Sequence, residues 1–93
     1  MTLIELCVDR AGFRRGARVM AFVIAWGRVR DDLGRTPTVD EYAEWWRQPV
    51  RTAYEEQERF REAFPELTNP DRLLDAMAAP SGGAIDTGAL TPA

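Results

Sequence analysis

The chain has 93 residues, 45% of them apolar, so one small domain with a packed core is expected. Its formal net charge of -3 weighs against a dedicated nucleic-acid binder, because DNA affinity depends largely on neutralising phosphates. The sole cysteine, Cys7, and the lack of histidine exclude an intramolecular disulfide and leave no usual zinc ligand set.

The first segment has the spacing of a helix-capping box. Thr2 can cap a helix with its hydroxyl oxygen, and Glu5 stands three residues later, where its carboxylate reaches back to the cap amide. We therefore predict a short helix from Leu3 to about Ala11, ended by Gly12. The apolar run at this end of the chain is broken only by Glu5, so a buried strand is the alternative. In either form the segment serves packing.

A long helix is predicted from Arg14 to Leu33, with Gly34 as its C-terminal cap. Apolar side chains cover most of its circumference, so this helix should lie at the centre of the fold. Gly16 and Gly27 either let another helix approach closely or are merely tolerated.

Two further helices should meet at a short corner. Thr38 and Glu41 form a second capping box, which starts a helix that runs to about Arg47. Pro49 breaks this helix and begins the next one, since proline is tolerated at the first helical position, and the second helix ends at Phe64 before another proline. The inward face of this last long helix is predicted to comprise Val50, Ala53, Tyr54, Gln57, Phe60 and Phe64.

The end of the chain contains one more short element. Asn69 followed by Pro70 indicates a new helix start, and an amphipathic pattern continues to about Ala78. Residues 79–93 are small, glycine-rich and almost uncharged, which predicts a flexible tail. The sequence therefore predicts an all-α domain over residues 1–78, a small bundle of four to five helices with a helix-turn-helix core at about residues 38–64.

Adjacent tryptophans, Trp45 and Trp46, stand near the end of the first helix of the corner. Trp46 shares a face with Val39, Tyr42 and Ala43, and Trp45 lies beside that face. We expect both indoles in the core, because large aromatics at helical spacing are usually packed. A partly exposed Trp45 would instead suit a protein contact.

The corner resembles the helix-turn-helix motif of DNA-binding proteins over residues 38–59. In that motif a small residue sits midway along the first helix, and a Ser or Thr and a small apolar residue sit early in the second. Ala43, Thr52 and Ala53 occupy these places. The turn position usually given to glycine holds Arg47, which requires either a left-handed backbone or a different turn. The resemblance implies a small DNA-binding transcriptional regulator.

In such a regulator the helix after Pro49 enters the major groove. Base edges would then be contacted by Gln48, Arg51, Thr52 and Glu55. Phosphates would be held by Thr38, by Arg47 and by one or more of Arg14, Arg15 and Arg18. A module of this size is expected to act as a homodimer or with a protein partner.

A non-catalytic protein-interaction module of the same fold is the alternative. The outer face of the last long helix is mixed in charge and slightly acidic. Its simplest interpretation is a solvent-exposed surface stabilised by close charge pairs within the helix. Such pairs would be Glu55 with Arg59, Glu58 with Arg61 and Arg59 with Glu62. The acidic helix or the C-terminal tail would then engage another protein and no nucleic acid.

Enzyme motifs are missing from the sequence. It contains no Gly-rich phosphate loop, no Ser-centred elbow and no cluster of metal ligands, so we expect neither catalysis nor a cofactor. The longest apolar run, Val19–Trp26, has eight residues, which is too short to cross a bilayer. We therefore expect a cytoplasmic protein without membrane contact.

Overall fold

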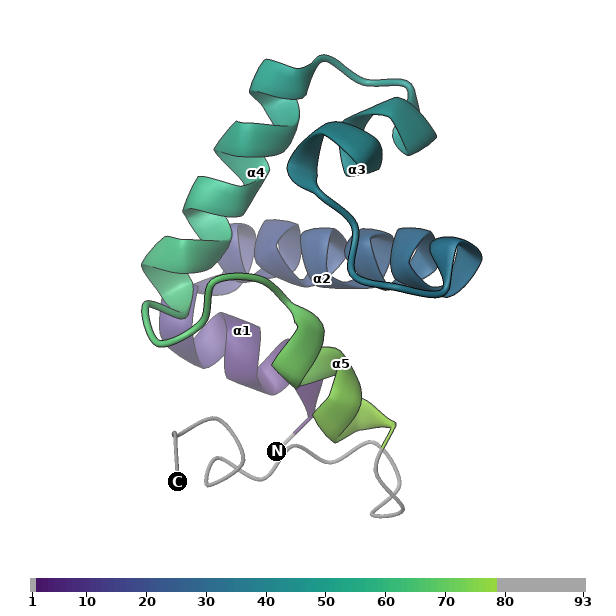
Figure 1. Cartoon of the computed structure of the whole chain (residues 1–93). Coiled ribbons are helices and arrows are strands. Elements are labelled where there is room, and N and C mark those ends of the chain that lie inside the picture. Colours follow the sequence, from purple (N-terminus) through teal and green to yellow (C-terminus); the bar gives the residue numbers. More distant parts are fainter. Residues whose placement is uncertain (1, 79–93) are drawn as a thin grey trace.

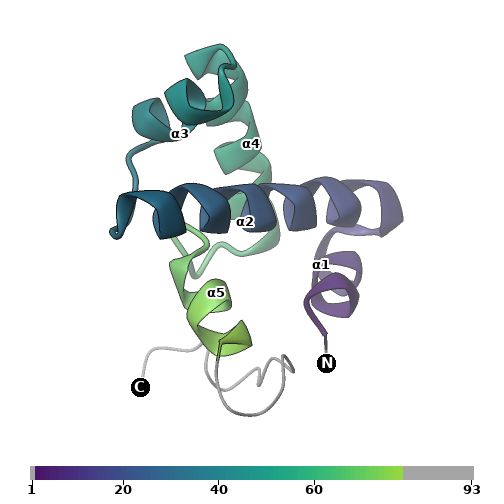
Figure 2. The same cartoon turned by 90° about the vertical axis from the view of Figure 1, so that its right-hand side faces the viewer.

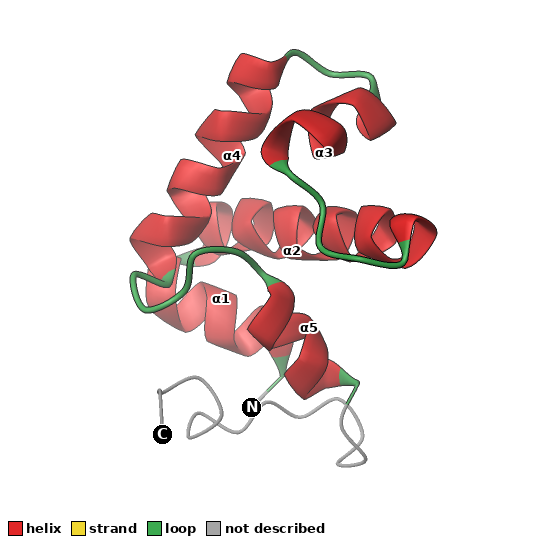
Figure 3. Cartoon of the chain, viewed as in Figure 1, coloured by secondary structure: helices red, strands yellow, loops and turns green. Residues whose placement is uncertain are grey.

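The computed structural model describes residues 2–78, and within this range the fold is all-α, as predicted. Figure 3 shows helices and loops and no strand in the described part of the chain. The expected tail, residues 79–93, lies outside the described residues. The five helices are α1 (Leu3–Ala11), α2 (Phe13–Leu33), α3 (Val39–Trp46), α4 (Val50–Ala63) and α5 (Asp71–Met77).

Helix α2 is the centre of the bundle, as its apolar circumference predicted. It contacts each of the other four helices. Figures 1 and 2 show α1 and α5 on one side of it, with α3 and most of α4 on the other. The apolar surface of α2 is not buried all round: Ile24 in the middle of the helix is half exposed, and Phe13 and Leu33 at its ends are exposed as well.

Aromatic rings join the helices in the core. Phe22 of α2 lies 5.3 Å from Tyr42 of α3 and 5.9 Å from Phe60 of α4, measured between ring centroids. Trp26 packs against the same cluster, 5.7 Å from Phe22. Edge and tilted ring arrangements of this kind add favourable contacts to the burial of apolar area. The cluster therefore fixes α3 and α4 against α2.

The N-terminal segment is helical, so the strand alternative is wrong. The Thr2 hydroxyl accepts a hydrogen bond from the Glu5 amide at 3.3 Å, as the capping pattern predicted. The Glu5 carboxylate accepts from the Thr2 hydroxyl at 2.9 Å and not from the Thr2 amide, so only half of the expected capping box forms. Helix α1 then packs very closely on α2 at Gly16. A Cβ atom at this position would lie 2.7 Å from the carbonyl oxygen of Cys7 and 2.8 Å from the Cα atom of Val8. Close helix contact is therefore the reason for this glycine.

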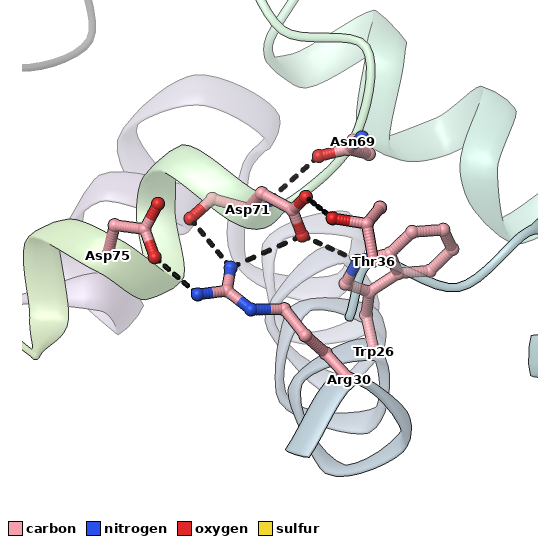
Figure 4. A network of polar contacts seen from close by, with 6 residues as sticks. All are labelled: Trp26, Arg30, Thr36, Asn69, Asp71 and Asp75. Atoms are coloured by element: carbon pink, nitrogen blue, oxygen red, sulfur yellow. Dashed lines mark hydrogen bonds and ion pairs between the residues drawn. The ribbon is translucent and has the colours of Figure 1, made fainter. Parts of the chain in front are cut away.

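Helix α5 is tied to α2 by a polar network around Asp71 (Figure 4). The Asp71 carboxylate accepts hydrogen bonds from Trp26 Nε1 at 3.0 Å and from the Thr36 hydroxyl at 2.5 Å. Arg30 adds an ion pair to Asp71 at 3.3 Å. The network is completed by an ion pair of Arg30 with Asp75 and by a hydrogen bond from the Asp71 amide to Asn69 Oδ1. One carboxylate thus holds α2, the loop before α3 and α5 together.

Candidate functional site

The capping box at the start of α3 is complete. The Thr38 hydroxyl accepts a hydrogen bond from the Glu41 amide at 3.1 Å, and the Thr38 amide donates to Glu41 Oε1 at 3.0 Å. Hydrogen bonds from Arg35, and then from the Thr38 amide, lower the pKa of Glu41 to about 2. Both groups of Thr38 therefore serve the cap, and the structure gives no support for the phosphate contact expected from this residue.

Three residues join α3 to α4, and the first has a left-handed backbone. Arg47 has φ 54 and ψ 46, which is one of the two solutions that its place in the motif allowed. The turn is closed by hydrogen bonds from the Arg47 amide to Glu44 O and from the Gln48 amide to Ala43 O. Pro49 has ψ 139, so it precedes the helix and does not begin it as predicted. The first helical residue is Val50.

The side chain of Gln48 is half-buried at the corner and forms a hydrogen bond to α4. Its Nε2 atom donates to Glu56 Oε1 at 2.8 Å, and Tyr42 Oη donates to Glu56 Oε2 at 3.0 Å. Burial first, and then the negative charge of Glu56, raise the pKa of Tyr42. Glu56 thereby joins α3 and the turn to α4, and Gln48 contributes to this structural contact, while the base contact expected of Gln48 stays a prediction.

Helices α3 and α4 cross at two small residues. Ala43 and Ala53 are both fully buried, which confirms that each lets the other helix approach. The same crossing leaves the outer side of the first turns of α4 open. The side chain of Arg51 is 91% exposed and contacts only Glu55, at 3.4 Å, while Thr52 is also exposed. Among the described residues 2–78, the pair of Arg51 with Glu55 is the only ion pair that involves α4. The three charge pairs that the sequence predicted along this helix do not form within its described residues.

Both tryptophans are partly exposed, so their assignment to the core is wrong. Trp45 is 37% and Trp46 41% exposed. Each indole N–H reaches α2: Trp45 donates to Asp32 at 2.8 Å and Trp46 to the carbonyl oxygen of Ala25 at 3.2 Å. Their rings contact each other edge to face, with centroids 4.7 Å apart. The pair therefore covers the outside of α2 and remains in contact with solvent.

Two residues predicted on the inward face of α4 are also exposed. Val50 is 44% and Tyr54 52% exposed, whereas Ala53 and Phe60 are fully buried. The buried stripe of α4 is thus narrower than the helical wheel suggested. Apolar side chains at this edge of α4 remain at the surface.

The arginines at the start of α2 do not lie beside the first turn of α4. Arg14 is exposed, and Arg15 and Arg18 lie at the opposite end of α4, where they share a groove with Arg59. We call this the arginine groove; its cavity is about 450 Å³. Its lining residues are Arg10, Ala11, Arg15, Arg18, Val19, Arg59, Glu62 and Ala63. Sequence reasoning missed Arg10 and Arg59, although Arg59 lies seven residues after Thr52 and so shares its side of α4.

Within residues 2–78 no three His, Cys, Asp or Glu side chains gather in a way that could hold a metal ion. No helix in this range has the length and apolarity that crossing a membrane requires. Comparison of the chain with protein-family models, with curated proteins and with solved structures gives no match. Function is therefore inferred from the geometry of the chain itself.

Proposed function

We propose that the chain binds duplex DNA as a small transcriptional regulator, with α3 and α4 as its helix-turn-helix. The main support is that the turn between α3 and α4 is held in place by hydrogen bonds while the first turn of α4 is exposed to solvent. Arg47 and the Glu56 hydrogen bonds set the corner, and Arg51 then extends from the first turn of α4 with 91% of its side chain exposed. A rigid helix that presents an exposed arginine near its N-terminus is suited to the major groove.

The outer residues of α4 offer chemistry for base recognition. A guanidinium can donate two hydrogen bonds to guanine, so Arg51 would be the main reading residue once it leaves Glu55. Glu55 would then accept from the amino group of cytosine, and Thr52 would contact either base type. A phosphate contact would come from Arg47 beside the corner.

The charge of the chain limits how it binds. With a net charge of -3, non-specific attraction to DNA should be weak, and specific contacts must supply more of the affinity. A single small module buries too little surface for tight operator binding. The regulator would therefore act as a homodimer, or beside a protein partner, so that two modules engage neighbouring half-sites.

The alternative function is a protein-interaction module. The observation that favours it is the edge-to-face pair of Trp45 and Trp46, both partly exposed. Exposed tryptophans are enriched where proteins bind one another. In this reading the indoles, with the exposed carboxylates of α4, contact another protein, and the corner has no DNA ligand.

A salt titration separates the two functions. Binding of a fluorescent random-sequence duplex is measured from low to physiological salt for the parent chain, for Arg51→Ala and for Arg72→Ala. Arg72 is exposed on α5 and serves as the matched loss of one charge. On a random-sequence duplex, DNA binding by α4 predicts a salt-dependent affinity that falls in Arg51→Ala by more than it falls in Arg72→Ala, because only Arg51 would lie against the DNA. No binding at low salt, or equal losses in both variants, would contradict DNA recognition by α4.

A further inference from the structure

We propose that the arginine groove is a binding site for a phosphate group. The groove lies where the C-terminal end of α1, the N-terminal half of α2 and the C-terminal half of α4 meet. In Figure 1 the start of α2 and the lower end of α4 lie together beside α1. It is thus remote from Arg51, at the other end of α4.

The groove holds an excess of positive charge. Arg15, Arg18 and Arg59 all line it, and none forms a salt bridge with another residue in the described range 2–78. Guanidinium groups stay protonated at any ordinary pH, so these charges cannot be relieved by proton loss. Glu62 is the one carboxylate in the lining, and it leaves most of the charge uncompensated. An anion bound in the groove would reduce the electrostatic repulsion between these positive charges.

A fourth arginine is anchored at the edge of the groove. Arg10 Nη1 donates to the carbonyl oxygen of Ala63 at 3.1 Å and to Glu66 Oε1 at 2.8 Å. Its guanidinium carbon also lies 4.9 Å from the centroid of the Phe64 ring. Arg10 therefore fixes α1 to the end of α4 beside the groove, while its own charge is largely satisfied by Glu66.

The number of free guanidinium groups favours phosphate over a carboxylate. Each guanidinium presents a planar pair of donors that matches two oxygens of a phosphate or a carboxylate. Three such groups offer more donors than the two oxygens of one carboxylate can accept, whereas a phosphate group presents further oxygens. A cavity of about 450 Å³ has the size of small-ligand sites and leaves room for part of the molecule that bears the phosphate.

The phosphate can belong to a DNA backbone or to a free small molecule. Arg59 lies seven residues beyond Thr52, which is about 10 Å along the same side of α4 and close to the width of the major groove. A duplex read by the start of α4 would therefore bring a backbone phosphate near the groove. Binding of a DNA backbone phosphate in the groove rests on the proposed DNA-binding function. Binding of a free phosphate compound is independent of that function.

The first arm of the test uses inorganic phosphate. Nitrogen-proton correlation spectra of the arginine Nε groups are recorded during a phosphate titration, with sodium chloride at matched ionic strength as the reference. The groove predicts saturable shifts of Arg15, Arg18 and Arg59 that chloride does not produce. It also predicts about tenfold weaker binding in Arg59→Gln and little change in Arg72→Gln.

The second arm measures duplex binding by Arg18→Gln, Arg59→Gln, Arg51→Ala and Arg72→Gln, with thermal unfolding confirming that each variant is folded. A DNA phosphate in the groove predicts lower affinity and a smaller salt slope for Arg18→Gln and Arg59→Gln than for Arg72→Gln. Phosphate binding without duplex binding supports the groove and overturns the proposed DNA function. If inorganic phosphate acts only as chloride does and duplex binding depends on Arg51 but not on Arg59, the groove is overturned and the DNA function stands. If neither arm depends on Arg18 or Arg59, the groove is overturned.

Discussion

At the scale of single residues, Tyr42 makes the fold sensitive to alkaline pH. Burial and the charge of Glu56 raise the pKa of its phenol above the ordinary value near 10. In the unfolded chain the phenol loses its proton near that value, whereas the folded protein retains it. Above about pH 10 the unfolded state therefore binds fewer protons, and the free energy of unfolding should fall as the pH rises.

Urea denaturation from about pH 8 to about pH 11 measures the slope of the free energy of unfolding against pH. Tyr42→Phe should lower stability near neutral pH by about 1 kcal/mol, because Glu56 loses a hydrogen bond, and should flatten the alkaline decline. A smaller decline should persist through Cys7, whose pKa burial raises to about 11. Tyr54→Phe is the control, since that side chain is half exposed and should leave the slope as it is in the parent chain. An unchanged slope in Tyr42→Phe would show that Tyr42 is not its source.

Two residues of the corner show which details a sequence can predict. The left-handed backbone of Arg47 was one of the two alternatives that its place in the motif left open, because that place is a property of the local chain. The role of Gln48 did not follow, because its partner Glu56 lies on the next helix and meets it only after α3 and α4 have packed. The local sequence therefore limited the backbone at Arg47 to two alternatives, and it gave no side-chain partners across the corner.

At the scale of elements, the helix ends set by a Thr or Gly cap were predictable because such caps act within a few residues, whereas the start of α4 at Val50 was placed one residue too early. Thr2, Thr38 and Gly34 each end or begin a helix where expected. The exposure of Trp45 and Trp46 was not predictable in this way. A helical wheel gives the face of a residue, but α3 is only eight residues long, and its last turn lies over the outside of α2. Which face of a short helix becomes buried depends on where the neighbouring helix ends.

The contact between α1 and α2 gives the prediction for this scale. Gly16→Ala places a methyl group 2.7 Å from backbone atoms of α1, which cannot move without separating the two helices. We expect a loss of about 1–3 kcal/mol in the free energy of unfolding, measured by urea denaturation, despite the better helix propensity of alanine. Gly27→Ala is the matched control, because its methyl group would meet the end of the Leu74 side chain, which can rotate. Equal losses in the two variants would contradict the special role of Gly16.

At the scale of the whole molecule, the candidate sites depend on contacts between segments far apart in the sequence. The arginine groove joins Arg15 and Arg18 to Arg59, and only the packing of α1, α2 and α4 brings them together. The cluster of arginines near residue 15 was visible in the sequence, but the end of α4 that it would face was not. The order of residues along the chain therefore indicated a local positive charge in a chain of net charge -3, and the tertiary fold determined its place.

The Asp71 network holds the molecule together in the same way. Asp71→Ala removes the hydrogen-bond acceptor of Trp26 and Thr36 and one ion-pair partner of Arg30. The buried indole N–H would then lack a partner, and we expect a loss of about 2–4 kcal/mol in the free energy of unfolding.

Asp75→Ala is the comparison that isolates the buried part of this network. The Asp75 side chain is 63% exposed and pairs with the same arginine, so its removal should cost at most about 1 kcal/mol. Hydrogen exchange adds a local measurement: in Asp71→Ala the amides of α5 should lose protection before those of α4, because α5 reaches the core mainly through Leu73 and this carboxylate. Equal losses of stability in the two variants would mean that the surface ion pairs, and not the bonds of Asp71 to Trp26 and Thr36, attach α5 to the bundle.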